Sequence, residues 1–279
     1  MDSSIISTLE SVYIQTRLGQ IRVRTGGQGP DSILFWPSLL MDGSMWSAQA
    51  TYFISRYRVI LLDSPGHGES SPLHQRFTFD ECAVVVTQIL DALDIQHAHF
   101  VGNSWGGMIG GTFAAQYPDR IGVAVLMNAT ASTAGLYQKL EFLMLTRLVS
   151  IIGYIPSPLV SRAIKAFIGP TSERERPQVA DSIRKSLHHI NPRSVIWAID
   201  SVVPFRPDQR LLFQSIRTPV LIVAGGEDRT FSVAETRIMA EAIPHAEFMV
   251  MPHTAHLAAL ECPDEVNTLI NDYLQRYQS

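Results

Sequence analysis

The sequence predicts an α/β protein in which helices cover both faces of one mostly parallel sheet. Short β-rich runs alternate with longer stretches of helical periodicity, and no internal repeat interrupts this order. Most of the short runs are apolar throughout, as parallel strands covered on both faces should be. A folded chain of this length buries roughly 75% of its unfolded surface, so the core needs neither metals nor disulfides. One large domain is therefore expected.

The first predicted element is a hairpin over residues 11–24, followed by shorter strands. Their positions are residues 33–36, 59–62, 99–101, 122–127, 219–224 and 247–251. Two amphipathic helices are well defined between and after them. The first follows Thr78, which forms the TxxE spacing of a capping box with Glu81. The second begins at Pro263 and carries an apolar stripe as far as Tyr277, so that it is expected to cover the sheet.

Residues 131–206 lack strand signals and show helical apolar patterns interrupted by glycine and proline. We interpret this stretch as a helical insertion into an α/β core formed by residues 1–130 and 207–279. The insertion holds ten basic and five acidic side chains, a net charge of +5, which leaves −9 on the rest of the chain. Basic outer faces of amphipathic helices explain this charge more simply than steering of a substrate does.

Composition excludes several classes of protein. The chain is 46% hydrophobic with a net charge of −4, which argues against disorder and against nucleic-acid binding. Its two cysteines, Cys82 and Cys262, are far apart and form no disulfide framework, which favours a reducing compartment. No apolar run approaches the ~20 residues needed to span a bilayer, and the amino terminus lacks the features of an export signal. We expect a cytoplasmic protein without membrane or nucleic-acid partners.

The most informative motif is a strand that runs into Gly102-Asn103-Ser104-Trp105-Gly106 and then into a helix of small residues. A serine on so sharp a turn has strained backbone angles, and its flanking glycines are required because a Cβ there would collide with a neighbouring element. The hydroxyl is expected above the sheet. The Trp105 amide, at the start of the helix, would then point to where an oxyanion forms.

A glycine-rich helix start can also serve close packing or bind a nucleotide phosphate. The chain contains no GxxxxGK[ST], the glycines do not fall as GxGxxG, and the next strand ends at Asn128 without a ribose-binding carboxylate. These absences argue against a nucleotide site.

A serine hydroxyl needs a base and a carboxylate that orients the base before it becomes nucleophilic at neutral pH. The strand at 219–224 is followed by Gly225, Gly226, Glu227 and Asp228, and His256 lies 28 residues beyond Asp228, after another strand. This Ser, Asp, His order is that of the α/β-hydrolases.

With DSPGHGES, GNSWGG, GGED and HLAALECP, the chain resembles the α/β-hydrolase family over nearly its whole length. The resemblance implies an eight-stranded, mostly parallel sheet flanked by helices, with residues 131–206 as a helical cap. It also implies a catalytic triad of Ser104, Asp228 and His256 that works without a cofactor. Glu227 is the rival acid, and it is less favoured because members with this turn use its last position. Asp63, in DSPGHGES, resembles a structural position of the family.

The loop after the strand at 33–36 departs from the family pattern. Most relatives have His-Gly there, whereas this chain has Pro37, Ser38, Leu39 and Leu40. Pro37 has no N–H to donate, and alignment of the following DGSMW places the second oxyanion donor at Leu39, with Ser38 as the fallback. The loop looks like that of the 3-oxoadipate enol-lactonases. One such donor is worth about 3 kcal/mol of transition-state stabilisation.

Histidine pairs such as His253 with His256 could be mistaken for metal ligands. Neither this pair nor His97 with His99, nor His188 with His189, completes a zinc signature. We expect no metal and no cofactor, and we interpret His67 as a turn residue.

The leading hypothesis is a serine hydrolase that cleaves a small carboxylic ester or lactone beneath an apolar cap. Ser38, Leu40, Leu145 and Leu148 are expected to contact this substrate. Several cap residues at helical spacing either line the acyl pocket or dock the cap: Leu140, Phe142, Leu145, Leu148, Ile151 and Ile152.

Two alternatives stay open. GNSWGG also resembles the elbow of the meta-cleavage C–C hydrolases, although their glycine-rich oxyanion loop is absent here. Their substrates carry a carboxylate, which an arginine of the cap could hold, the candidates being Arg147, Arg162, Arg184 and Arg193. The other alternative is a small-molecule receptor that keeps the triad. Acyl transfer and perhydrolysis would share the same acyl-enzyme and differ in the acceptor.

Overall fold

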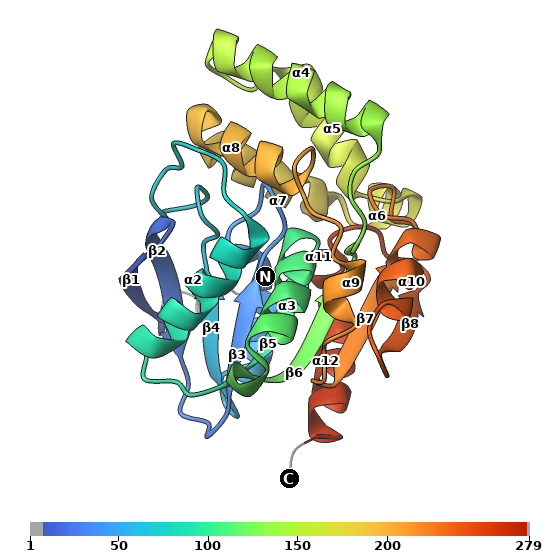
Figure 1. Ribbon diagram of the computed structural model, residues 1–279. Helices are drawn as coiled ribbons and strands as arrows, with labels where there is room; N and C mark the ends of the chain where they lie inside the picture. The colour runs from blue at the N-terminus through green and yellow to red at the C-terminus, as the bar shows by residue number, and fades with distance from the viewer. Residues whose placement is uncertain (1–7, 278–279) are drawn as a thin grey trace.

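The computed structural model describes residues 8–277 and is built on one eight-stranded sheet (Figure 1). The strand order is β1-β2-β4-β3-β5-β6-β7-β8. The pairs β1–β2 and β2–β4 are antiparallel, and every other neighbouring pair is parallel. The predicted eight-stranded, mostly parallel sheet is confirmed. Residues 1–7, on which part of the export-signal argument rests, lie outside the described residues.

Every predicted strand is present, and most extend one or two residues beyond the predicted limits. The strands are β1 (Glu10–Thr16), β2 (Gly19–Gly26), β3 (Ser32–Trp36), β4 (Arg58–Leu62), β5 (Ala98–Asn103), β6 (Ile121–Met127), β7 (Val220–Gly225) and β8 (Glu247–Met251).

Helices cover both faces of the sheet and form two apolar cores. One core joins the sheet to α2 (Phe79–Ala92), α3 (Trp105–Gln116), α9 (Arg210–Phe213) and α10 (Val233–Glu241). The other lies against η2 (Gly43–Trp46), α1 (Ser47–Phe53), α11 (Ala258–Glu261) and α12 (Pro263–Gln275). A short 3₁₀ turn, η3 (Pro118–Arg120), leads into β6.

The helix termini follow the sequence signals, with one difference. Thr78 forms the predicted capping box with Glu81 at the start of α2. Pro263 begins α12, where its missing N–H costs nothing. The expected apolar stripe of α12 ends at Leu274, because the helix stops at Gln275 and Tyr277 is 45% exposed.

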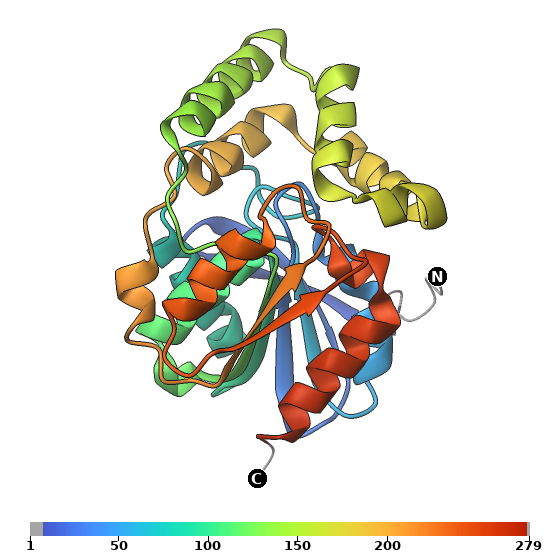
Figure 2. The same ribbon diagram turned by 90° about the vertical axis from the view of Figure 1, so that its right-hand side faces the viewer.

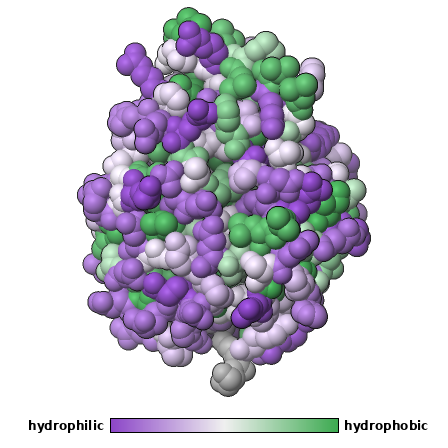
Figure 3. All heavy atoms as spheres, in the orientation of Figure 1, coloured by the Kyte–Doolittle hydropathy of each residue, from purple (hydrophilic) through white to green (hydrophobic). Residues whose placement is uncertain are grey.

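Five of the helices that the chain forms between β6 and β7, all of them before α9, lie above the sheet (Figures 1 and 2). They are α4 (Leu136–Ile152), α5 (Ser157–Phe167), α6 (Pro170–Glu175), α7 (Pro177–His189) and α8 (Pro192–Val202). We call these five helices the cap. Its outermost helix, α4, exposes large apolar side chains, and hydrophobic atoms are visible at this upper end in Figure 3. None of the helices within residues 8–277 combines the length and hydropathy that crossing a bilayer requires.

Candidate active site

Ser104 lies at the sharp turn between β5 and α3. Its backbone angles, φ 55° and ψ −112°, are strained for a residue with a side chain. The turn is held from both sides, because the Ser104 N–H donates to the Met127 carbonyl on β6 at 2.8 Å and its carbonyl accepts from Met108 on α3 at 3.0 Å. The surrounding sheet and helix thus fix the conformation that presents the side chain at the end of the strand.

The two glycines that flank this turn allow α3 to pack against the sheet. A Cβ on Gly102 would lie 2.3 Å from the Gly106 carbonyl oxygen. A Cβ on Gly106 would lie 2.2 Å from the Trp36 carbonyl oxygen on β3. Real Cβ atoms do not approach backbone atoms so closely, so the reason that the sequence suggested for these glycines agrees with the geometry.

His256 and Asp228 form a buried pair at the ends of β8 and β7. His256 Nδ1 lies 2.9 Å from Asp228 Oδ2. The other oxygen of Asp228 accepts the backbone N–H groups of Thr230 at 2.7 Å and Phe231 at 3.1 Å. With the proton of the neutral ring on Nδ1, the carboxylate orients the imidazole and Nε2 carries the free lone pair.

Glu227, the rival acid, faces the cap. Its carboxylate accepts the backbone N–H of Thr171 at 2.8 Å and the Thr171 hydroxyl at 2.6 Å, both at the start of α6. The partner of His256 is therefore Asp228.

The backbone of His256 is held by two elements that the sequence did not point to. Its N–H donates to the carbonyl of Phe167, at the end of α5, at 3.1 Å. The Phe167 ring also stacks on the imidazole at a centroid distance of 5.0 Å. The carbonyl of His256 accepts from Asn103 Nδ2 at 2.7 Å. Asn103 precedes the serine, so its side chain fixes the histidine loop relative to the Ser104 turn.

Glu261 holds the backbone of the loop that carries His256. Its buried carboxylate accepts the N–H groups of Ala255 and Leu257, which flank His256, and the hydroxyl of Ser172 on α6. Burial raises the pKa of Glu261, while these hydrogen bonds oppose the rise. The sequence contained this residue within HLAALECP but gave no signal of its role.

Ser104 and His256 both line a cavity of about 190 Å³ between the sheet and the cap. Nε2 of His256 is buried and has no hydrogen-bond partner among residues 8–277. The Ser104 hydroxyl and Nε2 form no hydrogen bond with each other, and such contacts often form only when substrate binds. An unpaired imidazole nitrogen in the wall of a cavity is a candidate proton acceptor.

Apolar side chains of the cap and of the loop after β3 form most of the cavity wall. Leu40, Phe142 and Leu145 line it, as the sequence suggested. Leu148 does not, because it lies on the outer face of α4 and is 46% exposed; Leu140 and Ile151 are exposed for the same reason. Ser38, also predicted to contact the substrate, is not among the residues that line the cavity; its buried hydroxyl accepts from Asn103 Nδ2 at 2.7 Å.

The expected oxyanion donors lie at the same end of the sheet. Trp105 begins α3, where the N–H groups have no acceptor within the helix. Its side chain is buried against Trp36, His67 and Phe77. Leu39 lines the cavity. The amide of its neighbour Leu40 is already engaged, since it donates to His67 Nε2 at 3.1 Å.

Two arginines line the cavity, and only one was among the candidates. Arg162 is half exposed and paired with Glu141 at 2.6 Å. Arg206 is 6% exposed, and no carboxylate in the described part of the chain lies within ion-pair distance of it. Its Nε–H donates to the Ser132 carbonyl at 2.8 Å. Burial lowers the pKa of Arg206 to about 10, with Glu235 opposing, so it stays charged at neutral pH.

Arg206 was missed because it is the last residue of the predicted insertion, and nothing in the linear pattern shows that its side chain turns back toward the cavity. Of the other candidates, Arg184 pairs with Asp181 at the surface, and Arg147 and Arg193 are exposed. Within residues 8–277, no three His, Cys, Asp or Glu side chains gather as they would around a metal ion.

The chain is similar to proteins of one known family. The model of the alpha/beta hydrolase fold family matches residues 31–263. The chain is 28% identical over 246 residues to 3-oxoadipate enol-lactonase 2 of Acinetobacter baylyi, covering 88% of this chain and 89% of that protein. It is 26% identical over 277 residues to a 2-hydroxy-6-oxononadienedioate/2-hydroxy-6-oxononatrienedioate hydrolase of a Pseudomonas species, covering 92% and 93%.

A solved structure shows a similar fold and sequence. A thermophilic esterase from Thermogutta terrifontis, determined with malate bound, superposes with a TM-score of 0.89 at 26% identity. The match covers 97% of this chain and all of that one.

The contact between Gly106 and β3 can be tested by stability. Gly106→Ala should lower the free energy of unfolding by about 1–3 kcal/mol, because the added methyl forces α3 away from Trp36. Urea unfolding followed by circular dichroism measures this loss. Gly135→Ala is the control, since Gly135 has open space around its Cα, and it should cost no more than about 1 kcal/mol. Equal losses in the two variants would contradict the packing argument.

Proposed function

We propose that this chain, which belongs to the α/β-hydrolase family, is a cofactor-independent serine hydrolase that cleaves a small carboxylic ester or lactone. The observation that carries the proposal is the buried His256–Asp228 pair: Nε2 of His256 has no hydrogen-bond partner among residues 8–277, and His256 lines the same cavity as Ser104. Ser104 would then be the nucleophile, His256 the base and Asp228 the acid that orients it, as acyl transfer requires.

In the proposed reaction, His256 Nε2 takes the proton of the Ser104 hydroxyl as the serine oxygen bonds to the substrate carbonyl carbon. The amides of Trp105 and Leu39 would stabilise the negative charge that forms on the carbonyl oxygen. His256 then gives its proton to the departing alkoxide as the ester bond breaks. Water, deprotonated by the same imidazole, then attacks the acyl-enzyme carbonyl. The imidazolium returns this proton to the Ser104 oxygen as the acyl bond breaks, which releases the acid and the free serine.

The cavity supports a small substrate with an apolar acyl group. Its volume is about 190 Å³, and most of its wall is apolar. The names of two similar proteins, an enol-lactonase and an esterase, support cleavage of a lactone or an ester.

A second candidate is a substrate that carries a carboxylate, cleaved at an ester, a lactone or a C–C bond. Arg206 favours it, because a buried guanidinium without an ion-pair partner in a largely apolar wall can gain one from the ligand. Its guanidinium carbon lies 5.6 Å from the Phe231 ring, and that ring lies 5.8 Å from the His256 ring. The Pseudomonas relative is named for a dioate. Against C–C cleavage stands the loop at Pro37 to Leu40, which is not rich in glycine.

Activation of Ser104 is tested with a fluorophosphonate. The wild type should acquire one adduct on Ser104, located by mass spectrometry of the digested protein. Ser104→Ala should remain unlabelled, and His256→Ala should react at least 100-fold more slowly, because a serine hydroxyl without a base is a poor nucleophile. A folded wild-type protein that stays unlabelled would overturn the proposal.

Turnover of p-nitrophenyl butyrate then separates an enzyme from a receptor. An enzyme should release many equivalents of p-nitrophenol per chain. A receptor that keeps the triad would give a single burst at most.

The identity of the acid is tested by a pair of neighbouring substitutions. Asp228→Asn should lower kcat for p-nitrophenyl butyrate by about 10⁴, because the amide favours the wrong tautomer of His256. Glu227→Gln should stay within about threefold of the wild type, since its carboxylate contacts Thr171 and not the imidazole. The reverse ranking would assign the acid to Glu227.

The role of Arg206 is tested by comparing an anionic ester with a neutral one. Arg206→Gln should lower kcat/KM for mono-p-nitrophenyl glutarate at least tenfold more than for p-nitrophenyl butyrate, which corresponds to about 1.4 kcal/mol. Arg162→Gln is the matched control, because this cavity-lining arginine already has a carboxylate partner. If Arg206→Gln lowers kcat/KM equally for both esters, Arg206 does not bind the carboxylate. Its role would then be limited to holding Ser132 in place.

A further inference from the structure

We propose that His67 and Ser186 are positioning residues that hold the backbone of Leu40 and thereby aim the neighbouring Leu39 amide into the cavity. The proposal rests on the proposed function, because that function assigns the oxyanion to the Leu39 amide.

Leu40 is the strained point of the loop between β3 and η2. Its φ of 69° lies in the left-handed region, which residues with a branched side chain rarely adopt. Such a conformation persists only where the surroundings hold it. Both backbone groups of Leu40 are held: the N–H donates to His67 Nε2 at 3.1 Å, and the carbonyl accepts from Ser186 Oγ at 2.7 Å. The next residue closes the turn, with the Met41 N–H donating to the Ser38 carbonyl at 3.1 Å.

The imidazole of His67 is fixed as an acceptor toward Leu40. His67 Nδ1 lies 3.1 Å from the carbonyl oxygen of Pro65, to which it must donate, so the lone pair of the neutral ring is on Nε2. The ring is buried, and burial lowers the pKa of His67 to about 4, against smaller opposing effects of Pro65 and Asp42. At neutral pH the ring therefore keeps its acceptor nitrogen.

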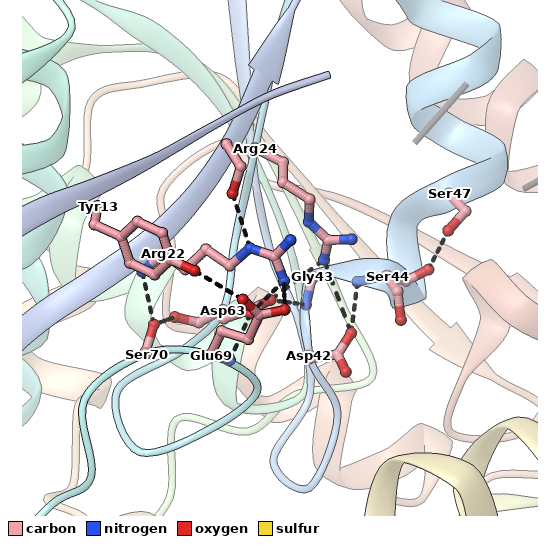
Figure 4. Close-up of polar contacts among 11 residues, drawn as sticks. Tyr13, Arg22, Arg24, Asp42, Gly43, Ser44, Ser47, Asp63, Glu69 and Ser70 are labelled. Carbon is pink, nitrogen blue, oxygen red and sulfur yellow. Dashed lines mark hydrogen bonds and ion pairs between the residues drawn. The ribbon is translucent and has the colours of Figure 1, made fainter. Parts of the chain in front are cut away.

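The loop that carries His67 is itself anchored to the loop that carries Leu40. Asp63 Oδ1 accepts the Gly43 N–H at 3.0 Å, and its Oδ2 accepts the Glu69 N–H at 2.9 Å (Figure 4). Arg24 donates to the same carboxylate at 3.3 Å. The carboxylate of Asp63 thus joins the end of one loop to the end of the other. The contact between His67 and Leu40 is a second connection between the same two loops, close to the cavity.

His67 also packs against the residue that supplies the other expected oxyanion donor. The ring centroids of His67 and Trp105 are 5.6 Å apart. One imidazole thus contacts the start of α3 and the loop of Leu39. We infer that it sets the spacing between the two donor amides.

Ser186 brings the cap into this arrangement. It lies on α7, and its hydroxyl is the cap's hydrogen bond to the Leu40 carbonyl. A second serine of the cap, Ser194 on α8, accepts the Leu73 N–H at 2.8 Å and donates to the Gly66 carbonyl at 3.3 Å, next to His67. The cap therefore contacts both loops, so that its seating is coupled to the position of the Leu39 amide.

The kinetic test compares two buried histidines. His67→Phe keeps an aromatic ring against Trp105 and removes the acceptor for Leu40. It should lower kcat for p-nitrophenyl butyrate at least 30-fold with KM changed less than threefold, because a misplaced oxyanion donor acts in the transition state. His67→Gln again offers the Leu40 N–H an acceptor, at a similar distance from the backbone. It should recover at least a third of the loss in log kcat that His67→Phe causes. Ser186→Ala should lower kcat threefold to tenfold.

His99→Phe is the control. His99 Nδ1 also accepts a backbone N–H, from Val123 at 3.1 Å, but it lies at the start of β5, far from Ser104 at its end. This variant should lose stability toward urea while kcat stays within threefold of the wild type. If His67→Phe and His99→Phe lower kcat equally, or if His67→Phe leaves kcat unchanged, the positioning role is overturned.

Amide hydrogen exchange, followed by NMR, measures whether the Leu40 N–H is hydrogen-bonded, and the measurement needs no enzymatic activity. In the wild type the Leu40 N–H should be protected, and in His67→Phe it should exchange at least tenfold faster while the amides of β5 keep their rates. Protection that is lost in His67→Phe, in a chain that hydrolyses no ester, would overturn the proposed function and leave the hold on Leu40 established. An unchanged exchange rate would overturn the hold itself, whatever the activity.

Discussion

The arrangement of the site depends on the close approach of α3 to the sheet at the Ser104 turn. Backbone atoms of Gly102, Gly106 and Trp36 are so near one another that no side chain fits at either glycine. The strained Ser104 turn joins these two elements, and the side-chain nitrogen of Asn103, one residue earlier, reaches two other loops. Asn103 Nδ2 donates to Ser38 in the loop after β3 and to the carbonyl of His256. The Ser104 turn is therefore tied, through Asn103, both to the loop after β3 and to the loop that carries His256.

The cap is connected to the same loops through polar contacts as well as apolar packing. Phe167 accepts from the His256 N–H, Thr171 donates to Glu227, Ser172 donates to Glu261, and Ser186 donates to the Leu40 carbonyl. Three of these bonds end on loops at the carboxyl edge of the sheet, and the fourth ends on Glu261 of α11, whose carboxylate holds the loop of His256. The bonds to His256 and Glu261 are buried, where hydrogen bonds are stronger than at the surface and losing one leaves a polar group unpaired. Those to Glu227 and Leu40 are partly buried. The cap thus helps to define the geometry of the loops that it covers.

Much of the fold could be predicted from the sequence, because the strands are continuous apolar runs and the helices carry clear caps and stripes. The Ser104 turn was also predictable, because the spacing of the glycines indicates where the backbones of two elements come close together. The lining of the cavity was not. Helix α4 has apolar residues on two faces, so spacing alone cannot distinguish Leu145, which faces the cavity, from Leu148, which faces outward. Arg206, Glu261 and His67 contact residues that are distant in sequence. The sequence shows that these side chains are present, but it does not show what they contact.

The hydrogen bonds between cap and core limit how the cap could be exchanged with that of another family member. If the five helices were a separable module, exchanging them for those of another family member would alter substrate choice alone. Here the hydroxyls of Thr171, Ser172 and Ser186 and the carbonyl of Phe167 complete loops that belong to the core. A transplanted cap would need matching donors and acceptors at these four places. Without them, a chimera would acquire the selectivity of its new cap, but the loops of the candidate active site would be held less firmly.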